Sequence, residues 1–273
     1  MGMRSKDQWI ERSKAWTKTV APGISADDTF NKMIIAETGI LPGEKLLDLA
    51  SGTGNPAISI AYSMNEIGEV FCTDLTEKML YSARQRAKNL DLDIVKFIAA
   101  DMGSLPFTDN IFDVITCRFG AMFSEDKVSV TLESHRTLKK GGRAAYIVWG
   151  SYEENPPFHI PRREVYSYLG IEEGPTPERH SMSAPGDLEE MLTGGNFSRV
   201  EERELRYTNP IEDIKDYVTR NLNRSFSKET EDMTEAAFCD LRQAVIKAWK
   251  PFIKNGILLV PNYARLGLGW KTS

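Results

Sequence analysis

The chain has 273 residues, of which 41% are hydrophobic and 27% are charged. This composition is typical of a globular protein, and the length is enough for one large α/β domain. Lysine and arginine number 34 against 39 aspartates and glutamates, so the net charge is −5. An acidic balance disfavours a general nucleic-acid binder. Three scattered cysteines exclude a disulfide framework, and the absence of a CxxC motif or His/Cys cluster predicts no metal site.

The sequence also carries no targeting signal that we can identify. No apolar run reaches the roughly 18 residues that a membrane span requires, so we expect no transmembrane helix. The N-terminus lacks the apolar segment of a secretory signal, and Lys6 breaks the myristoylation pattern. We therefore expect a cytoplasmic protein.

The elements alternate regularly through the first half of the chain. Periodicity predicts helices over 6–18 and 26–39, and we expect residues 1–40 to form a helical lid. A core over 41–150 then alternates short apolar strands with helices, as parallel sheets covered on both faces do. The predicted strands are Lys45–Leu49, Glu69–Thr73, Val95–Ala99, Phe112–Cys117 and Arg143–Trp149. The predicted helices are Pro56–Met64, Glu77–Leu90 and Asp126–Leu138, the last of them stopped by Gly141 or Gly142.

The alternation stops after Trp149. Residues 151–185 are rich in proline and glycine and predict a loop-rich insertion. The C-terminal part, residues 186–273, resumes the pattern of helices and strands. Its predicted elements are the helices Asp187–Thr193, Ile211–Asn221 and Thr234–Phe252 and the strands Arg199–Tyr207 and Tyr263–Trp270.

A glycine-rich turn is the first segment that carries chemistry. Residues 47–57, with the sequence LDLASGTGNPA, run from a strand into a helix. Gly52 and Gly54 permit a tight turn and let a ligand approach the backbone. Asn55 is suited to cap the helix, and Pro56 suits its first position. The pattern G-x-G-x-x-A indicates a nucleotide cofactor, although a plain glycine turn also produces it.

Two acids follow the next strands. Asp74 lies about twenty residues after the glycines, where such folds place a carboxylate on ribose hydroxyls. The alternative is a helix cap, since Thr76 opens the next helix. Asp101 follows the third strand, where it can accept a bond from an adenine amino group or serve as a solvated turn acid. Leu75 and Met102 are placed to sandwich the base.

The run 46–149 resembles the class I S-adenosylmethionine-dependent methyltransferases, in the small-molecule group that includes the ubiquinone/menaquinone-biosynthesis enzymes. Four motifs in family order carry the resemblance: Asp-x-Ala-x-Gly-x-Gly at 48–54, an acid after the second strand, Ala-Asp with Leu-Pro-Phe and Phe-Asp over 100–113, and Leu-Lys-x-Gly-Gly at 138–142. It implies a single Rossmann-like α/β domain over 1–273. We expect a seven-stranded, mostly parallel sheet with an antiparallel last strand, Tyr263–Trp270, and a helical cap over 211–252.

The resemblance implies S-adenosylmethionine as cofactor, S-adenosylhomocysteine as product and a small-molecule methyl acceptor. The cofactor residues that it assigns are Asp48, Ala50, Ser51, Gly52, Thr53, Gly54, Asp74, Leu75, Met79, Asp101, Met102 and, through its backbone, Arg118. One departure is the segment Arg118–Phe123, which lacks the histidine-containing run of some quinone-pathway members. This departure counts against a quinone substrate.

Methyl transfer from a sulfonium is an in-line displacement, which requires alignment and the exclusion of water. The acceptor is expected beyond the C-terminal strand ends. The candidate acceptor residues are Trp16, Phe119, Phe123, Trp149 and Tyr152. His159 and His180 are candidate bases, needed only if the acceptor loses a proton, with structural histidines as the alternative. We also hypothesise that Arg118 positions a carboxylate of the substrate or cofactor.

Two other functions remain open on the sequence. An NAD-dependent oxidoreductase would also use the glycine turn and Asp74, but Pro56 removes a donor from the helix start and no Tyr-x-x-x-Lys pair exists. A non-catalytic S-adenosylmethionine-binding module is the second alternative. The tetrapeptide Asn155–Phe158 matches a motif of amine and amide methyltransferases. There it follows the fourth strand, whereas here it follows the fifth, so we interpret it as part of a loop.

Overall fold

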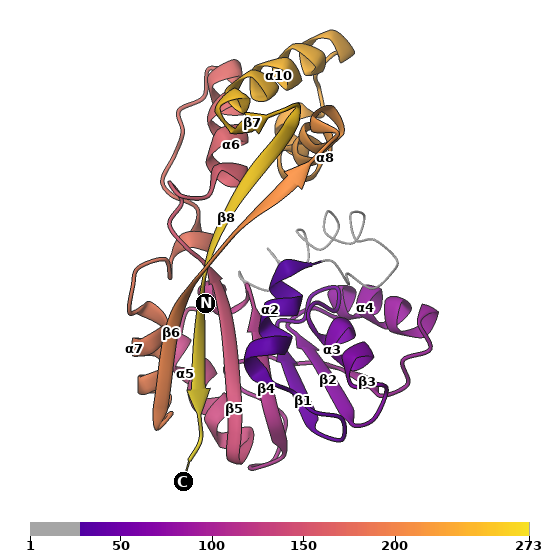
Figure 1. Cartoon of the computed structure of the whole chain (residues 1–273), viewed down its shortest axis with the longest axis vertical. Helices are drawn as coiled ribbons and strands as arrows, with labels where there is room; N and C mark the ends of the chain where they lie inside the picture. The colour runs from indigo at the N-terminus through magenta and orange to yellow at the C-terminus, as the bar shows by residue number, and fades with distance from the viewer. Residues whose placement is uncertain (1–27, 273) are drawn as a thin grey trace. The chain divides into compact units, whose positions relative to one another are not determined.

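The computed structural model describes residues 28–272 (Figure 1). The predicted helix 6–18 and Trp16 lie outside these residues. The described chain divides into two compact units. Unit 1 holds residues 28–148, 184–203 and 265–272, and unit 2 holds residues 149–183 and 204–264.

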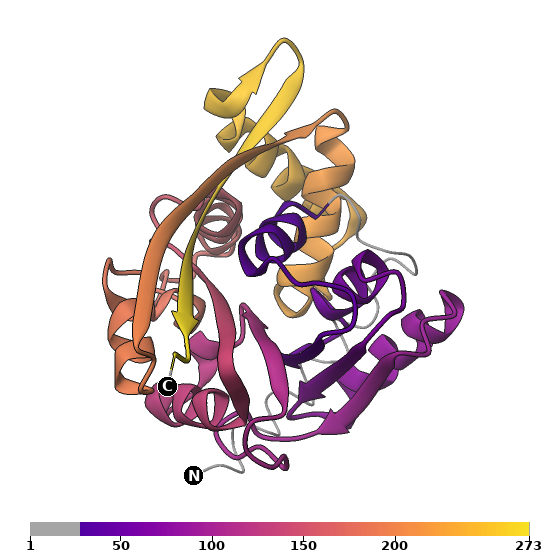
Figure 2. The same ribbon diagram turned by 60° about the horizontal axis from the view of Figure 1, so that its bottom comes forward.

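Unit 1 is built on a parallel sheet (Figure 2). Its parallel strands are β1 (Lys45–Leu49), β2 (Glu69–Asp74), β3 (Val95–Ala99), β4 (Phe112–Arg118) and β5 (Leu138–Trp149). Their spatial order is β3-β2-β1-β4-β5, so the chain leaves β1 toward one edge and later returns to its other side with β4. The sheet therefore has a topological switch point between β1 and β4, which is where open α/β sheets bind ligands.

Helices connect these strands on both sides of the sheet. The helices of unit 1 are α2 (Thr29–Thr38), α3 (Ala57–Ser63), α4 (Glu77–Asn89), α5 (Lys127–Thr137) and α7 (Asp187–Gly194), with the short helix η1 (Ala121–Phe123). Right-handed crossovers place α3 and α4 on one face and α5 on the opposite face, because the connections run in opposite directions from the switch point. In agreement, α3 contacts α4, and α5 contacts α7. The predicted doubly covered sheet is confirmed.

The last strands extend the sheet beyond β5. They are β6 (Arg199–Ile211), the two-residue β7 (Ile253–Lys254) and β8 (Ile257–Trp270). The order continues β5-β8-β6, and β7 pairs with β8. Gly141 donates to the Lys271 carbonyl and Gly150 to the Tyr263 carbonyl, so β8 runs antiparallel to β5. Within the described residues, the predicted seven strands and the antiparallel last strand are confirmed, with β7 as an addition.

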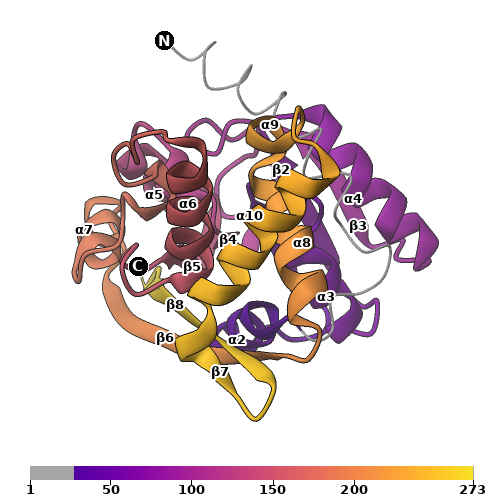
Figure 3. The same cartoon turned by 90° about the horizontal axis from the view of Figure 1, so that it is seen from above.

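Unit 2 contains the remaining helices. They are α6 (Pro156–Leu169), α8 (Ile214–Ser225), α9 (Ser227–Thr230) and α10 (Glu235–Ala248), with the short helices η2 (Glu178–His180) and η3 (Lys250–Phe252). Helix α10 packs against both α6 and α8 (Figure 3). Trp249, Val245 and Leu241 lie in the buried cluster between them. Over residues 28–272, no helix has the length and apolar character that a membrane crossing requires.

Two local predictions away from the glycine turn were wrong. Residues 155–158 are not a loop but the start of α6, with Asn155 at the N-cap and prolines in the first turn, where the missing N–H groups cost nothing. The pair Gly141–Gly142 does not stop a helix. Helix α5 already ends at Thr137, and both glycines lie within β5 near a register shift against β4. Gly141 has a φ of 77°, which glycine adopts without strain.

The Asn155 side chain ties two distant parts of unit 2 together. Its amide nitrogen donates to the carbonyls of Ser151 and Tyr263, each at 2.9 Å, and its oxygen accepts from the Tyr263 N–H at 3.0 Å. The residue is fully buried. Both N–H groups are used and the oxygen is buried against the backbone, so the carboxamide is not presented to an amine substrate.

We predict that Asn155→Ala lowers the free energy of unfolding by about 2–3 kcal/mol, because the buried Tyr263 N–H loses its acceptor. Chemical denaturation measures the change. Asn223→Ala, at an exposed position of α8, is the matched control and is expected to leave stability within about 0.5 kcal/mol of the wild type. Equal stability of the two variants would contradict a tethering role for Asn155.

Candidate functional site

The turn after β1 has a backbone that few sequences adopt. Ala50, Gly52 and Gly54 have φ values of 50°, 55° and 95°. The Ser51 N–H donates to the Thr73 carbonyl at 2.8 Å, which holds the turn against the end of β2. A Cβ on Gly54 would lie 2.6 Å from Ile58 Cδ1, so the second glycine is also required for packing against α3. The predicted cofactor residues 50–54 thus form one rigid turn.

The helix start after this turn differs from the prediction. Helix α3 begins at Ala57 with Pro56 at the N-cap position and no side-chain cap. The Asn55 carboxamide oxygen instead accepts from Asn31 at 3.3 Å and from Arg86 at 3.5 Å. Asn55 is therefore occupied by neighbouring elements of unit 1 and does not cap α3.

Asp48 lies buried beneath the turn. Its side chain is 0% exposed, and Oδ1 accepts from the Thr116 hydroxyl at 2.6 Å. This bond follows from the register, since Asp48 and Thr116 are paired across β1 and β4. Oδ2 has no hydrogen-bond partner among residues 28–272. Burial raises the pKa of Asp48 to about 7, although the Thr116 bond opposes the shift.

Asp74 contacts the turn directly from the end of β2. Its Oδ2 accepts from the Gly52 N–H at 3.0 Å, and its Oδ1 accepts from the N–H and hydroxyl of Thr76. Asp74 supports the start of α4 and also touches the glycine turn. Both predicted roles, that of a helix cap and that of a contact to the cofactor, therefore have a physical basis. Burial raises the pKa of the Asp74 carboxyl above its usual value. These three bonds leave one of the roughly four lone-pair sites of the carboxylate, on Oδ2, to accept a further bond.

The predicted adenine residues stand at the ends of β2 and β3. The Ala100 N–H donates to the Asp74 carbonyl at 3.0 Å, which brings the two strand ends together. Asp101 is exposed, and its Oδ1 accepts from the Gly103 N–H at 2.8 Å. Leu75 and Met102 are half-buried, whereas Met79 is buried on α4. We call residues 48–54, 74–75, 79, 101–102 and 118 the strand-end site.

The segment after β4 lies against the glycine turn. Phe119 has a φ of 58°, which is rare for a bulky residue and concentrates at functional sites. A Cβ on Gly120 would lie 2.5 Å from the Ala50 Cβ. Phe119 packs edge-on against Phe30 with ring centroids 5.0 Å apart, and Phe123 is half-buried in η1. The ends of β1 and β4 therefore form one contiguous surface.

Arg118 already holds a carboxylate of this chain. Its Nη2 lies 2.6 Å from Asp28 Oδ2, and its side chain is 14% exposed. Asp28 is also the N-cap of α2, where Oδ1 accepts from the N–H groups of Phe30 and Asn31. The pair thus joins the end of β4 to the start of α2.

Two buried polar residues that the sequence analysis did not single out brace the turn. Asn31 of α2 donates to Ser59 at 2.9 Å as well as to Asn55. Arg86 of α4 donates to the Thr53 carbonyl at 2.5 Å. Arg86 lies among the buried residues of α4. An arginine at a core-facing position of a helix indicates a buried polar partner, because arginine is seldom buried unpaired.

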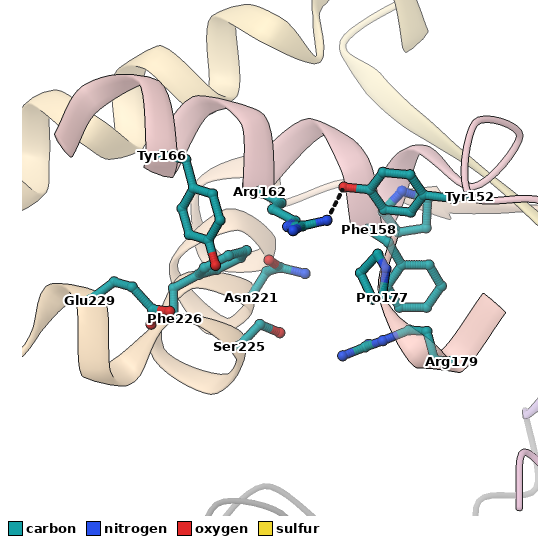
Figure 4. Close-up of a pocket in the computed structure, with 11 residues that line it drawn as sticks. Tyr152, Phe158, Arg162, Tyr166, Pro177, Arg179, Asn221, Ser225, Phe226 and Glu229 are labelled. Carbon is teal, nitrogen blue, oxygen red and sulfur yellow. Dashed lines mark hydrogen bonds between the residues drawn. The ribbon is translucent and has the colours of Figure 1, made fainter. Parts of the chain in front are cut away.

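The other candidate residues belong to unit 2. Trp149 packs edge-on against Phe158, with centroids 4.8 Å apart. His180 is 4% exposed, its Nδ1 lies 2.7 Å from the Gly150 carbonyl, and burial lowers its pKa to about 4. Burial also lowers the pKa of the half-buried His159. Tyr152 contacts both imidazoles edge-on and lines a pocket of unit 2 (Figure 4).

Comparison with known proteins gives consistent matches. The model of the ubiE/COQ5 methyltransferase family matches residues 23–169, more than half of the chain. The ubiquinone/menaquinone biosynthesis C-methyltransferase UbiE of Cupriavidus necator is 36% identical over 124 residues, which cover 44% of this chain and 51% of that protein. The chain thus matches about half the length of such curated relatives.

Two solved structures show the same fold. The YcgJ protein from Bacillus subtilis is 19% identical with a TM-score of 0.55, covering 89% of this chain and 98% of that one. The phosphoethanolamine N-methyltransferase 2 of Haemonchus contortus, crystallised with S-adenosyl-L-methionine, is 19% identical with a TM-score of 0.55. The match covers 89% of this chain and 52% of that one. At these identities the likeness concerns the fold.

We predict that Asp48→Asn removes a pH dependence of stability. The raised pKa means that the folded chain keeps a proton that the unfolded chain releases, so the contribution of Asp48 to stability is present at low pH and lost as pH rises toward 7. Relative to the wild type, the variant is expected to gain about 3 kcal/mol between pH 5 and pH 8. Denaturant titrations at both pH values, with the exposed Asp93→Asn as control, measure the change. A pH-independent difference would mean that Asp48 is ionised throughout.

Proposed function

The chain belongs to the ubiE/COQ5 methyltransferase family, and we propose that it transfers a methyl group from S-adenosylmethionine to a small-molecule acceptor. The observation that carries this proposal is the position of Asp48. A buried acid with an unpartnered oxygen lies directly under a glycine turn, at the switch point of a parallel sheet. A cation bound above the turn would stabilise the ionised carboxylate, and the methionine part of S-adenosylmethionine is cationic.

The strand-end site suits the other parts of this cofactor. Asp74, with one lone pair of Oδ2 left beside the Gly52 N–H, would accept from a ribose hydroxyl. Asp101 would accept from the adenine amino group, with Leu75 and Met102 against the ring. The turn itself would hold the methionine part through its backbone. These assignments are proposals, supported by the convergence of all these residues on the ends of β1, β2 and β3.

The bound cofactor supplies an activated methyl group, and the chain aligns and shields the acceptor. The side chains proposed for this task on unit 1 are Phe119, whose neighbour Gly120 approaches Ala50 of the turn, and the half-buried Phe123 of η1. Apolar surroundings do not oppose the step, because charge disperses as the methyl group moves. His180 would be a poor base at neutral pH, since its pKa is lowered to about 4 and Nδ1 is held by Gly150. His159, half-buried, is the better candidate where a proton must leave.

The family match supports methyl transfer over the NAD-dependent alternative, and so does Pro56, which offers no N–H at the start of α3. The named relatives act in ubiquinone and menaquinone biosynthesis, but their similarity covers about half of each protein. We therefore propose a small-molecule acceptor without adopting a quinone. The net charge of −5 supports a small molecule rather than a nucleic acid.

The deciding experiment is calorimetric titration of S-adenosylmethionine and S-adenosylhomocysteine into the wild type, Asp74→Asn and the exposed control Asp93→Asn. We expect micromolar-range binding to the wild type and the control, and a loss of at least about tenfold in affinity for Asp74→Asn, because charge-assisted hydrogen bonds are lost. If the wild type binds neither compound, the proposal is wrong, and the same titration is then made with NAD.

A pair of variants separates two roles of Arg118. If its guanidinium positions the carboxylate of the cofactor, Arg118→Ala lowers S-adenosylmethionine affinity by about tenfold. We expect this result, together with near-normal affinity for Asp28→Ala, which removes the carboxylate that pairs with Arg118. Small effects of both variants on affinity, accompanied by a loss of thermal stability in each that is larger for the helix cap Asp28, would show that Arg118 serves only to anchor α2.

A further inference from the structure

Asp48 is an acid enclosed by unit 1 with no salt bridge of its own within residues 28–272. Arg118, the cation that acts on it through space, makes its salt bridge with Asp28 instead. Removal of a carboxylate from water is costly unless a cation pairs with it, so a buried acid of this kind favours its neutral, protonated form. The free protein therefore holds a proton at the end of β1.

Few donors oppose this preference. Oδ1 of Asp48 accepts from the Thr116 hydroxyl at 2.6 Å, whereas Oδ2 makes no hydrogen bond among residues 28–272. The Ser51 hydroxyl, which donates to the Asp48 backbone carbonyl at 2.8 Å, and the Ala57 N–H favour the ionised form more weakly. Burial outweighs these contacts, and the pKa of Asp48 lies at about 7.

The other titratable groups around Asp48 come from β2, β4 and α4. Cys72, its partner across β1 and β2, and Cys117 of β4 are both fully buried. Burial raises the pKa of both thiols, that of Cys117 to about 12, so neither carries a charge near pH 7. Arg86 of α4 acts on Cys72 and donates to the Thr53 carbonyl at 2.5 Å. A new positive charge at the glycine turn would therefore change the ionisation of Asp48 before that of its neighbours.

We propose that binding of the cofactor is coupled to the loss of a proton from Asp48. The methionine part of the cofactor carries an ammonium group, and a cation near a buried acid favours its ionised form. The O–H bond of the carboxyl breaks, its electron pair stays on the oxygen, and the proton passes to the solvent. The coupling requires no contact between the ligand and Asp48, because charges attract across a turn of low dielectric constant. This inference rests on the proposed function, which places the methionine part at the turn.

The coupling gives cofactor affinity a pH dependence of defined sign. Well below pH 7 the protein releases a proton in order to bind, whereas well above pH 7 Asp48 is already ionised. The affinity for S-adenosylhomocysteine, which keeps the ammonium group, is therefore expected to rise about tenfold from pH 6 to pH 8.

Calorimetric titration of the full chain counts the protons. S-Adenosylhomocysteine is titrated in PIPES and in imidazole, because the different heats of ionisation of these buffers reveal proton release. We expect roughly 0.8 of a proton to leave near pH 6.5 and roughly 0.1 at pH 8. Methylthioadenosine, which shares the adenosine part but has no ammonium group, is the matched control ligand and is expected to release no proton.

Variants assign the proton to Asp48. Asp48→Asn is expected to bind S-adenosylhomocysteine without proton release and with an affinity that does not change with pH. Thr116→Val removes the donor to Oδ1, so the pKa of Asp48 rises further and several-fold more protons leave at pH 8 than in the wild type. Asp74→Asn, which removes the second buried acid at the turn, binds more weakly but keeps the proton release per bound ligand. The exposed Asp93→Asn is the matched control variant.

The outcomes separate this inference from the proposed function. The same binding enthalpy in both buffers would overturn the inference and leave the proposed function standing. Equal proton release by Asp48→Asn and the wild type would also overturn it, because the proton would then come from another group. If S-adenosylhomocysteine and S-adenosylmethionine do not bind at all, the proposed function is wrong and the inference is wrong with it.

Discussion

The close approach between the ends of β1 and β4 constrains the backbone on both sides of the strand-end site. Gly120 lies so near Ala50 that one added carbon atom would stand 2.5 Å from the Ala50 Cβ. Neither strand end can shift without opening this contact, because the strands are hydrogen-bonded up to the residues before it. The contact brings the glycine turn against the left-handed Phe119, just beyond the strand pairing that sets the buried Asp48–Thr116 bond. Backbone strain at Ala50 and Phe119 is tolerated because the surrounding structure fixes both residues.

Polar side chains reinforce this contact from outside the sheet. Asn31, Asn55 and Arg86 come from three separate segments and converge on the turn through hydrogen bonds. On the other side, the Arg118–Asp28 pair attaches the start of α2 to β4. Arrangements of this kind hold a site in its binding geometry before a ligand arrives, so less ordering is required on binding.

Sequence periodicity predicted the strands well because the buried parallel strands are short apolar runs flanked by turns. Val95–Ala99 and Lys45–Leu49 have the predicted bounds. Prediction failed where proline and glycine, which are typical of loops and helix ends, instead belong to a helix or a strand. In Asn155–Phe158 the prolines begin a helix, and at Gly141 glycine belongs to an irregular strand. The glycine turn and Asp74 could be placed from spacing, whereas Arg162, Arg179 and Asn221, which line the pocket of unit 2, could not. Their shared pocket depends on how helices pack, which spacing along one segment does not reveal.

The sheet order has a consequence for synthesis of the chain. Strand β5 has β4 on one side, but its other neighbour, β8, is the last described strand along the sequence. Gly150 and its partner Tyr263 are more than 100 residues apart, so at roughly 5–20 residues per second the ribosome leaves this edge unpaired for several seconds. An open apolar edge strand is a template for aggregation. The nascent protein is therefore most prone to aggregation after its parallel core has formed. Pairing of β8 with β5 removes this open edge.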